Sequence, residues 1–175
     1  MMKHANLIRI IISLVILQVP FSVSADSSEK RYRLAGHPAT TAVMFKDLSN
    51  DMDPLIRKRV ASNRKTPKDI LLGLTKDSDQ SVKISLATNL SAPDEVFTIL
   101  ARDPLLAVRS VVARFEYVPV EALTILAKDK DADIRLEVVR NLNTSKDIIL
   151  QLINDQDEIV RATAQQALQR QQDDK

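Results

Sequence analysis

Residues 77–102 read DSDQSVKISLATNLSAPDEVFTILAR, and the same pattern returns every 26 residues along most of the chain. The most regular column is aspartate, at Asp51, Asp77, Asp103, Asp129 and Asp155. Five residues after each aspartate comes Ile or Val, and the next residue is always basic: Arg57, Lys83, Arg109, Arg135 and Arg161. A fixed period of this length, kept without a gap, is the signature of a repeat architecture.

Each unit predicts two short helices. The first, at residues 54–62 and their equivalents, follows the cap candidates Asp53, Asp79, Asp131 and Asp157. Its buried stripe carries Ile56 and Val60. An asparagine follows the helix, as Asn63, Asn89 and Asn141, and asparagine tolerates the left-handed backbone conformation that ends many helices. The second, at residues 67–75, starts with proline at its first helical position. Acids in its first turn complement the helix dipole, and Thr66 and Thr144 are candidates for capping boxes.

Helices of this length are unstable alone in water, so each must bury its apolar stripe against neighbouring units. The pattern therefore predicts an all-α fold, an α-solenoid of about five and a half two-helix repeats over residues 30–175. From about residue 157 the sequence stays helical but becomes rich in glutamine, which predicts a polar capping helix.

The unit D-x-D-x-x-V-R-x-x-V-A-x-N-x-x-x-P-x-E-x-L-x-x-L-A, present with substitutions at residues 77–101, resembles the leucine-rich repeat variant family. More broadly, it is similar to short HEAT-like repeats. The resemblance implies a right-handed superhelix of alternating α-helices and tighter 3₁₀-type helices, and it implies no activity. Departures are local, at Lys83, Leu105, Phe115 and Ser145. Some family members hold a cysteine-ligated iron–sulfur cluster, which this cysteine-free chain has no ligands to bind.

Residues 1–25 read MMKHANLIRIIISLVILQVPFSVSA and predict a secretory signal peptide, cleaved after Ala25. Basic residues come first, an apolar run from Leu7 to Val19 follows, and small residues precede the cleavage point. An uncleaved signal anchor is the alternative, although the run is shorter than a bilayer span requires. Residues 26–29 would form a short polar linker, and the protein would be periplasmic or secreted.

The residue types needed for catalysis are scarce. There is no cysteine, and His37 is the one histidine after residue 25, so we expect no catalytic residue, no cofactor and no transition-metal site. Gly36 and Gly73 stand alone and form no phosphate-binding loop. The alternating carboxylates of Asp129, Asp131 and Asp133 suggest calcium, but the glycine and distant glutamate of such a loop are missing, and helix capping explains them better. We therefore predict that the chain is not an enzyme.

Charge is distributed unevenly along the chain. After residue 25 basic and acidic residues balance, which disfavours a general nucleic-acid binder. Residues 30–68 nevertheless hold ten basic residues against three acidic ones, a net charge of +7. The column of basic residues could line a polyanion groove, but the aspartate column of equal period favours a ladder of ion pairs between repeats.

Two clusters are candidates for partner binding. The first is the basic set Arg57, Lys58, Arg59, Arg64 and Lys65, which could face an anionic surface or simply be solvated. The second is Arg114, Phe115 and Tyr117, because arginine and aromatic residues on a surface loop are typical interface anchors; Phe115 could instead pack beneath the turn. The sequence thus predicts a non-catalytic exported scaffold that binds a partner protein through an extended surface. The alternative is binding of an anionic polymer or membrane surface by the basic repeats, and an unrecognised enzyme is a remote one.

Overall fold

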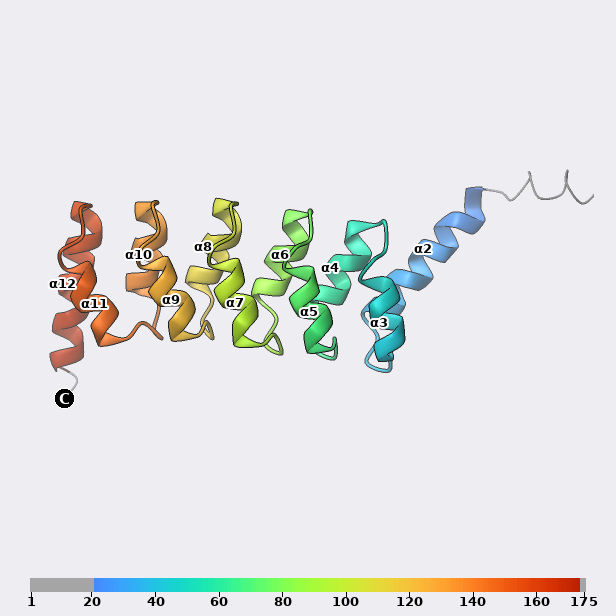
Figure 1. Cartoon of the computed structure of the whole chain (residues 1–175), viewed down its shortest axis with the longest axis horizontal. Helices are drawn as coiled ribbons and strands as arrows, with labels where there is room; N and C mark the ends of the chain where they lie inside the picture. Colours follow the sequence, from blue (N-terminus) through green and yellow to red (C-terminus); the bar gives the residue numbers. More distant parts are fainter. Residues whose placement is uncertain (1–20, 174–175) are drawn as a thin grey trace, which may run out of the picture.

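The computed structural model describes residues 21–173, and the regular secondary structure within that range is entirely α-helical. The helices, named as in Figure 1, are α2 (Phe21–Ala35), α3 (Ala42–Leu48), α4 (Pro54–Ser62), α5 (Lys68–Leu74), α6 (Gln80–Ala87), α7 (Asp94–Leu100), α8 (Leu106–Arg114), α9 (Val120–Leu126), α10 (Ala132–Arg140), α11 (Lys146–Leu152) and α12 (Glu158–Asp173). The all-α prediction is confirmed for this range.

The helices stand side by side in an elongated row of two layers (Figure 1). One layer holds α4, α6, α8, α10 and α12, which we call the first helices; each packs against the next in the row. The other holds the shorter α3, α5, α7, α9 and α11, which we call the second helices. The second helices are α-helical over seven residues each, where the family resemblance implies 3₁₀ geometry. Hydrogen bonds of the tighter i→i−3 kind occur at their C-terminal ends, as from Lys76 N to Gly73 O.

A continuous apolar core runs between the two layers. The apolar columns of the 26-residue pattern lie in this core at every repeat. The column of Ile56 is at most 1% exposed throughout, and Val60, Leu71 and Leu74 lead three more buried columns. Fully burying one such side chain contributes about 1.5–3 kcal/mol, so the sequence period and the source of stability coincide.

The predicted aspartate caps are present. Asp53, Asp79 and Asp131 accept hydrogen bonds from the backbone N–H two residues on, at 2.8–2.9 Å, and so begin α4, α6 and α10. The asparagine prediction is wrong: Asn63 and Asn141 have extended backbone, at φ −79° and −72°, and no residue other than glycine in the described range has a positive φ. Their side chains act between repeats instead, as described below.

Two predictions for the start of the second helices need correction. Pro67, Pro93 and Pro119 are the N-cap residues and not the first helical residues. Thr66 and Thr144 form no capping box, because each hydroxyl donates back to the preceding first helix, to Val60 O at 2.7 Å and Val138 O at 2.5 Å. The acids of the first turn, Asp69, Glu95, Glu121 and Asp147, do lie where predicted.

At the N-terminal end, residues 26–29 belong to α2, where the sequence predicts a linker. Within the described range no helix is long and apolar enough to cross a bilayer. Residues 1–20 of the predicted signal peptide lie outside the described residues. At the other end of the row, α12 packs on α10 and α11.

Candidate functional site

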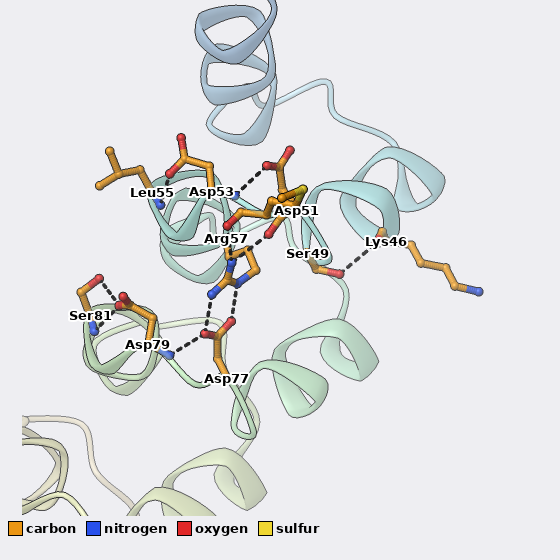
Figure 2. A network of polar contacts seen from close by, with 10 residues as sticks. Lys46, Ser49, Asp51, Asp53, Leu55, Arg57, Asp77, Asp79 and Ser81 are labelled. Carbon is orange, nitrogen blue, oxygen red and sulfur yellow. Dashed lines mark hydrogen bonds and ion pairs between the residues drawn. The ribbon is translucent and has the colours of Figure 1, made fainter. Parts of the chain in front are cut away.

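The basic column forms ion pairs between successive repeats, and Figure 2 shows one of them, Arg57 with Asp77. Arg57 of α4 holds both carboxylate oxygens of Asp77, with Nε to Oδ2 at 2.7 Å and Nη2 to Oδ1 at 2.9 Å. Its third nitrogen, Nη1, donates to Asp51 O at 2.8 Å. One guanidinium thus ties together the loops that open two successive repeats.

The same bridge recurs with a separation of 20 residues along the row. The pairs are Arg31–Asp51, Arg57–Asp77, Lys83–Asp103, Arg109–Asp129 and Arg135–Asp155, at 2.6–2.7 Å. The predicted ladder is therefore present. Arg57, which the sequence suggests for partner binding, belongs to this ladder, and its guanidinium is not presented to a partner.

The ladder changes the acidity of its carboxyl groups. Burial alone would raise the pKa of Asp77, but the hydrogen bonds from Arg57 and from the Asp79 N–H outweigh it, so the pKa is lowered. The hydrogen bond from Arg135 is the main cause of the lowered pKa of Asp155. Asp79, which caps α6, also has a lowered pKa because the Ser81 hydroxyl and N–H donate to it. These acids remain charged at neutral pH and serve structure.

A second ladder lies at the opposite ends of the first helices and consists of asparagines. Asn89 donates from Nδ2 to Ala61 O at 2.7 Å and to Asn63 O at 3.2 Å, both in the preceding repeat. Asn63 and Asn141 make the equivalent contacts with their own preceding repeats. Each asparagine Oδ1 also accepts from the N–H two residues on. Both edges of the row are thus used for stacking.

Phe115 occupies the asparagine column in one repeat and interrupts this second ladder. Its ring stacks on Phe97 of α7 at 5.6 Å between centroids, and Tyr117 meets it edge-on at 5.9 Å. Phe115 is therefore half-buried and partly structural. Tyr117 is 62% exposed and Arg114 is also exposed, so only these two of the three predicted residues face solvent freely.

The other predicted basic residues remain on the surface. Lys58 and Arg59 lie on α4, and Arg64 and Lys65 lie in the loop that follows; all four are exposed. The Arg59 guanidinium lies over the Tyr32 ring of α2, 5.4 Å from its centroid. Arg59 and Arg64 also line a common pocket of about 240 Å³ with Gly36, Ser62 and Asn63.

On the outward face of the second helices, the predicted first-turn acids are joined by two further rows of side chains that were not predicted from the sequence. The first turns of these helices expose an acidic row, Asp69, Glu95, Glu121 and Asp147. Three or four residues later comes an aliphatic row, Leu72, Ile99, Ile125 and Leu150, of which Ile99 is 39% and Leu150 is 41% exposed. At the far ends lies an exposed basic row, Lys76, Arg102 and Lys128. We call this surface the second-helix face. The basic row keeps the 26-residue period, so the signal was available in the sequence.

Chemistry-bearing groups do not converge within residues 21–173. No cluster of three or more His, Cys, Asp or Glu side chains there has a geometry that could hold a metal ion. Asp129 and Asp131 are used in the ladder and in capping α10. The His37 ring accepts a hydrogen bond from Ala39 N at 3.1 Å, which closes a loop.

The chain is similar in structure to a solved protein, whereas its sequence matches no family model and no curated protein. Among solved structures, the crystal structure of an engineered protein from the Northeast Structural Genomics Consortium is similar over 89% of this chain and 93% of its own, with 17% sequence identity and a TM-score of 0.44.

Proposed function

We propose that this chain is an exported, non-catalytic scaffold that binds a partner protein along the second-helix face. Its architecture would be a right-handed α-solenoid of about five and a half repeats, of the leucine-rich repeat variant or HEAT-like kind. Solenoids of this kind present long preformed surfaces, because each repeat contacts only its neighbours and leaves its outer side free.

The observation that carries the proposal is the contrast between the edges of the row and the second-helix face. At the edges, the aspartate and asparagine side chains are used to join repeats. On the second-helix face, the aliphatic row continues over four repeats, exposed at Ile99 and Leu150 and half-buried at Leu72 and Ile125. It lies between the acidic row and the basic row, which have opposite charge. An apolar strip with a charged rim on either side is the usual composition of a protein interface. The charges would set the orientation of the partner, and the aliphatic row would contribute most of the affinity.

A site-specific photo-cross-linking experiment in intact cells tests this proposal. A photoreactive residue at Ile99 lies on the second-helix face, and the matched control at exposed Ala107 lies on α8 in the other layer. We expect a discrete adduct from Ile99 that disappears when Glu95→Lys and Arg102→Glu are combined, and none from Ala107. The same adducts from both positions, or none from Ile99, would overturn the proposal.

Export is tested separately by sequencing the N-terminus of the protein recovered from cells. The expected first residue is Asp26, from cleavage after Ala25. A chain that still begins at Met1 or Met2 would show that the segment is retained as an anchor.

A further inference from the structure

We propose that the pocket between Arg59 and Arg64 binds the phosphate headgroup of an anionic lipid. The proposal goes beyond the protein-binding function, because the pocket lies at the end of α4 and not on the second-helix face. It is lined by Gly36, Arg59, Ser62, Asn63 and Arg64, so none of the described residues lining it is acidic. Two guanidinium groups on one pocket suit phosphate, because each can donate a pair of parallel hydrogen bonds to its oxygens.

The pocket is specific to one repeat. The positions of Arg59 and Arg64 are taken by Ser85 and Leu90 in the next unit, and by Glu137 and Leu142 two units further on. The ladder residues, by contrast, recur in every unit because stacking requires them. Stacking has no comparable need for the two pocket arginines, which indicates a role outside the repeat framework.

Local contacts hold Arg59 in place. Its guanidinium lies over the Tyr32 ring at 5.4 Å, an arrangement that orients the cation without neutralising it. Its side chain also passes directly against the backbone of Gly36, where a Cβ atom would collide with Arg59 Nε. The absence of a side chain at residue 36 therefore leaves the space that the Arg59 guanidinium occupies beside the pocket.

The surroundings favour a lipid as the source of the phosphate. Leu55 precedes Lys58 and Arg59 by one helical turn on α4, so it shares their face, and it is 58% exposed. Exposed aliphatic and basic side chains on one face are typical of proteins that bind at the membrane interface. In sequence, the apolar run from Leu7 to Val19 ends just before α2, so this end of the row is next to the bilayer during export, until the proposed cleavage after Ala25.

Vesicle flotation with the full chain tests the proposal. Binding to vesicles that contain phosphatidylglycerol is divided by binding to vesicles of pure phosphatidylcholine. Because the N-terminal apolar segment contributes equally to both, this ratio measures the preference of the protein for the anionic headgroup. We expect the combined Arg59→Gln and Arg64→Gln variant to lower that ratio about 30-fold, since each basic residue near an anionic surface contributes about fivefold. The matched control, Arg102→Gln with Lys128→Gln, removes the same charge from the second-helix face and should change the ratio less than about twofold.

A second variant separates the pocket from charge in general. Gly36→Ala leaves every charge in place and displaces the Arg59 guanidinium, which is the flexible end of its side chain. The Gly36 backbone has no positive φ, so the chain tolerates alanine there. We expect a several-fold lower ratio with an unchanged melting temperature. An unchanged ratio in these variants, or an equal loss in the matched control, would show that the pocket is not the binding site. Binding of inorganic phosphate without binding to vesicles would show that the phosphate does not come from a lipid.

Discussion

Arg135 and Asp155 form a two-pronged ion pair that joins α10 to the loop before α12. Nε lies 2.7 Å from Oδ2 and Nη2 lies 2.8 Å from Oδ1, while Nη1 donates to Asp129 O at 2.7 Å. Both side chains are almost inaccessible, at 5% and 6% exposure. Three donors of one guanidinium therefore fix the spacing between two repeats.

The first prediction concerns the energy of this rung. Arg135→Ala leaves the Asp155 carboxylate buried without its partner, and we expect a loss of about 3–5 kcal/mol in the free energy of unfolding. Replacing both residues, as Arg135→Met with Asp155→Leu, removes the buried charges together and should cost less than either single change. Urea denaturation followed by circular dichroism measures both. The control is Arg140→Ala, because the Arg140 side chain is exposed and its 3.6 Å pair with the half-buried Glu137 should contribute less than about 1 kcal/mol.

The second prediction is a loss of stability in acid. The pKa values of Asp77, Asp79 and Asp155 are lowered in the folded chain, so the unfolded chain binds protons first as the pH falls. The contribution of these groups to the free energy of unfolding is complete at pH values above their unfolded pKa of about 3.9. It is lost as the pH falls through their lower folded pKa values. The free energy of unfolding should therefore be flat from neutral pH to about pH 5 and should decline below about pH 4.

The variant Asp77→Asn identifies the source of this decline. Its stability at neutral pH should be lower because the Arg57 pair is weakened, and its further loss between pH 5 and pH 3 should be smaller than in the unmodified chain. The exposed Asp94 supplies the matched control as Asp94→Asn. A decline of equal steepness in Asp77→Asn and in the unmodified chain would contradict this assignment.

The third prediction concerns the asparagine ladder. Asn89 is 3% exposed and satisfies carbonyls of the preceding repeat, so Asn89→Ala should cost about 1–3 kcal/mol of unfolding free energy. Asn154→Ala changes the same residue type at an exposed position and should cost less than about 0.5 kcal/mol. Equal costs from the two changes would mean that the interrepeat hydrogen bonds do not stabilise the row.

The repeat period is the part of this structure that the sequence predicts best. Buried columns, aspartate caps and the pairing of Arg57 with Asp77 all follow from residue types that return every 26 positions. The predictions for Asn63 and Thr66 were wrong because both side chains reach carbonyls that only the folded arrangement brings close, Ala35 O and Val60 O. Propensity rules describe hydrogen bonds to backbone groups within a few residues, so they contain no information on carbonyl partners that lie further back in the chain.

The candidate sites were less predictable for a related reason. Arg57 and Arg59 lie in the same turn of α4 and have the same charge. Arg57 is nevertheless used in the ladder, whereas the Arg59 guanidinium lies over the Tyr32 ring. A charge count cannot separate them, whereas the 26-residue column can: Arg57 has a basic equivalent in every later unit, and Arg59 has none. The periodic residues are those used in stacking, and the departures from the period are the better candidates for binding.

The fourth prediction tests whether the units are modular. Deleting residues 78–103 removes one whole unit and joins Asp77 to Pro104, so Asp77 takes the position of Asp103 and remains available to Arg57. Helical circular dichroism per residue and cooperative melting should both be kept. Inserting one residue after Val112 instead rotates the remainder of α8 by about 100°, turns Ala113 out of the core, and lengthens the span from Arg109 to Asp129. We expect this insertion to cost about 3 kcal/mol or more, and a deletion that costs as much as the insertion would contradict a stack of independent units.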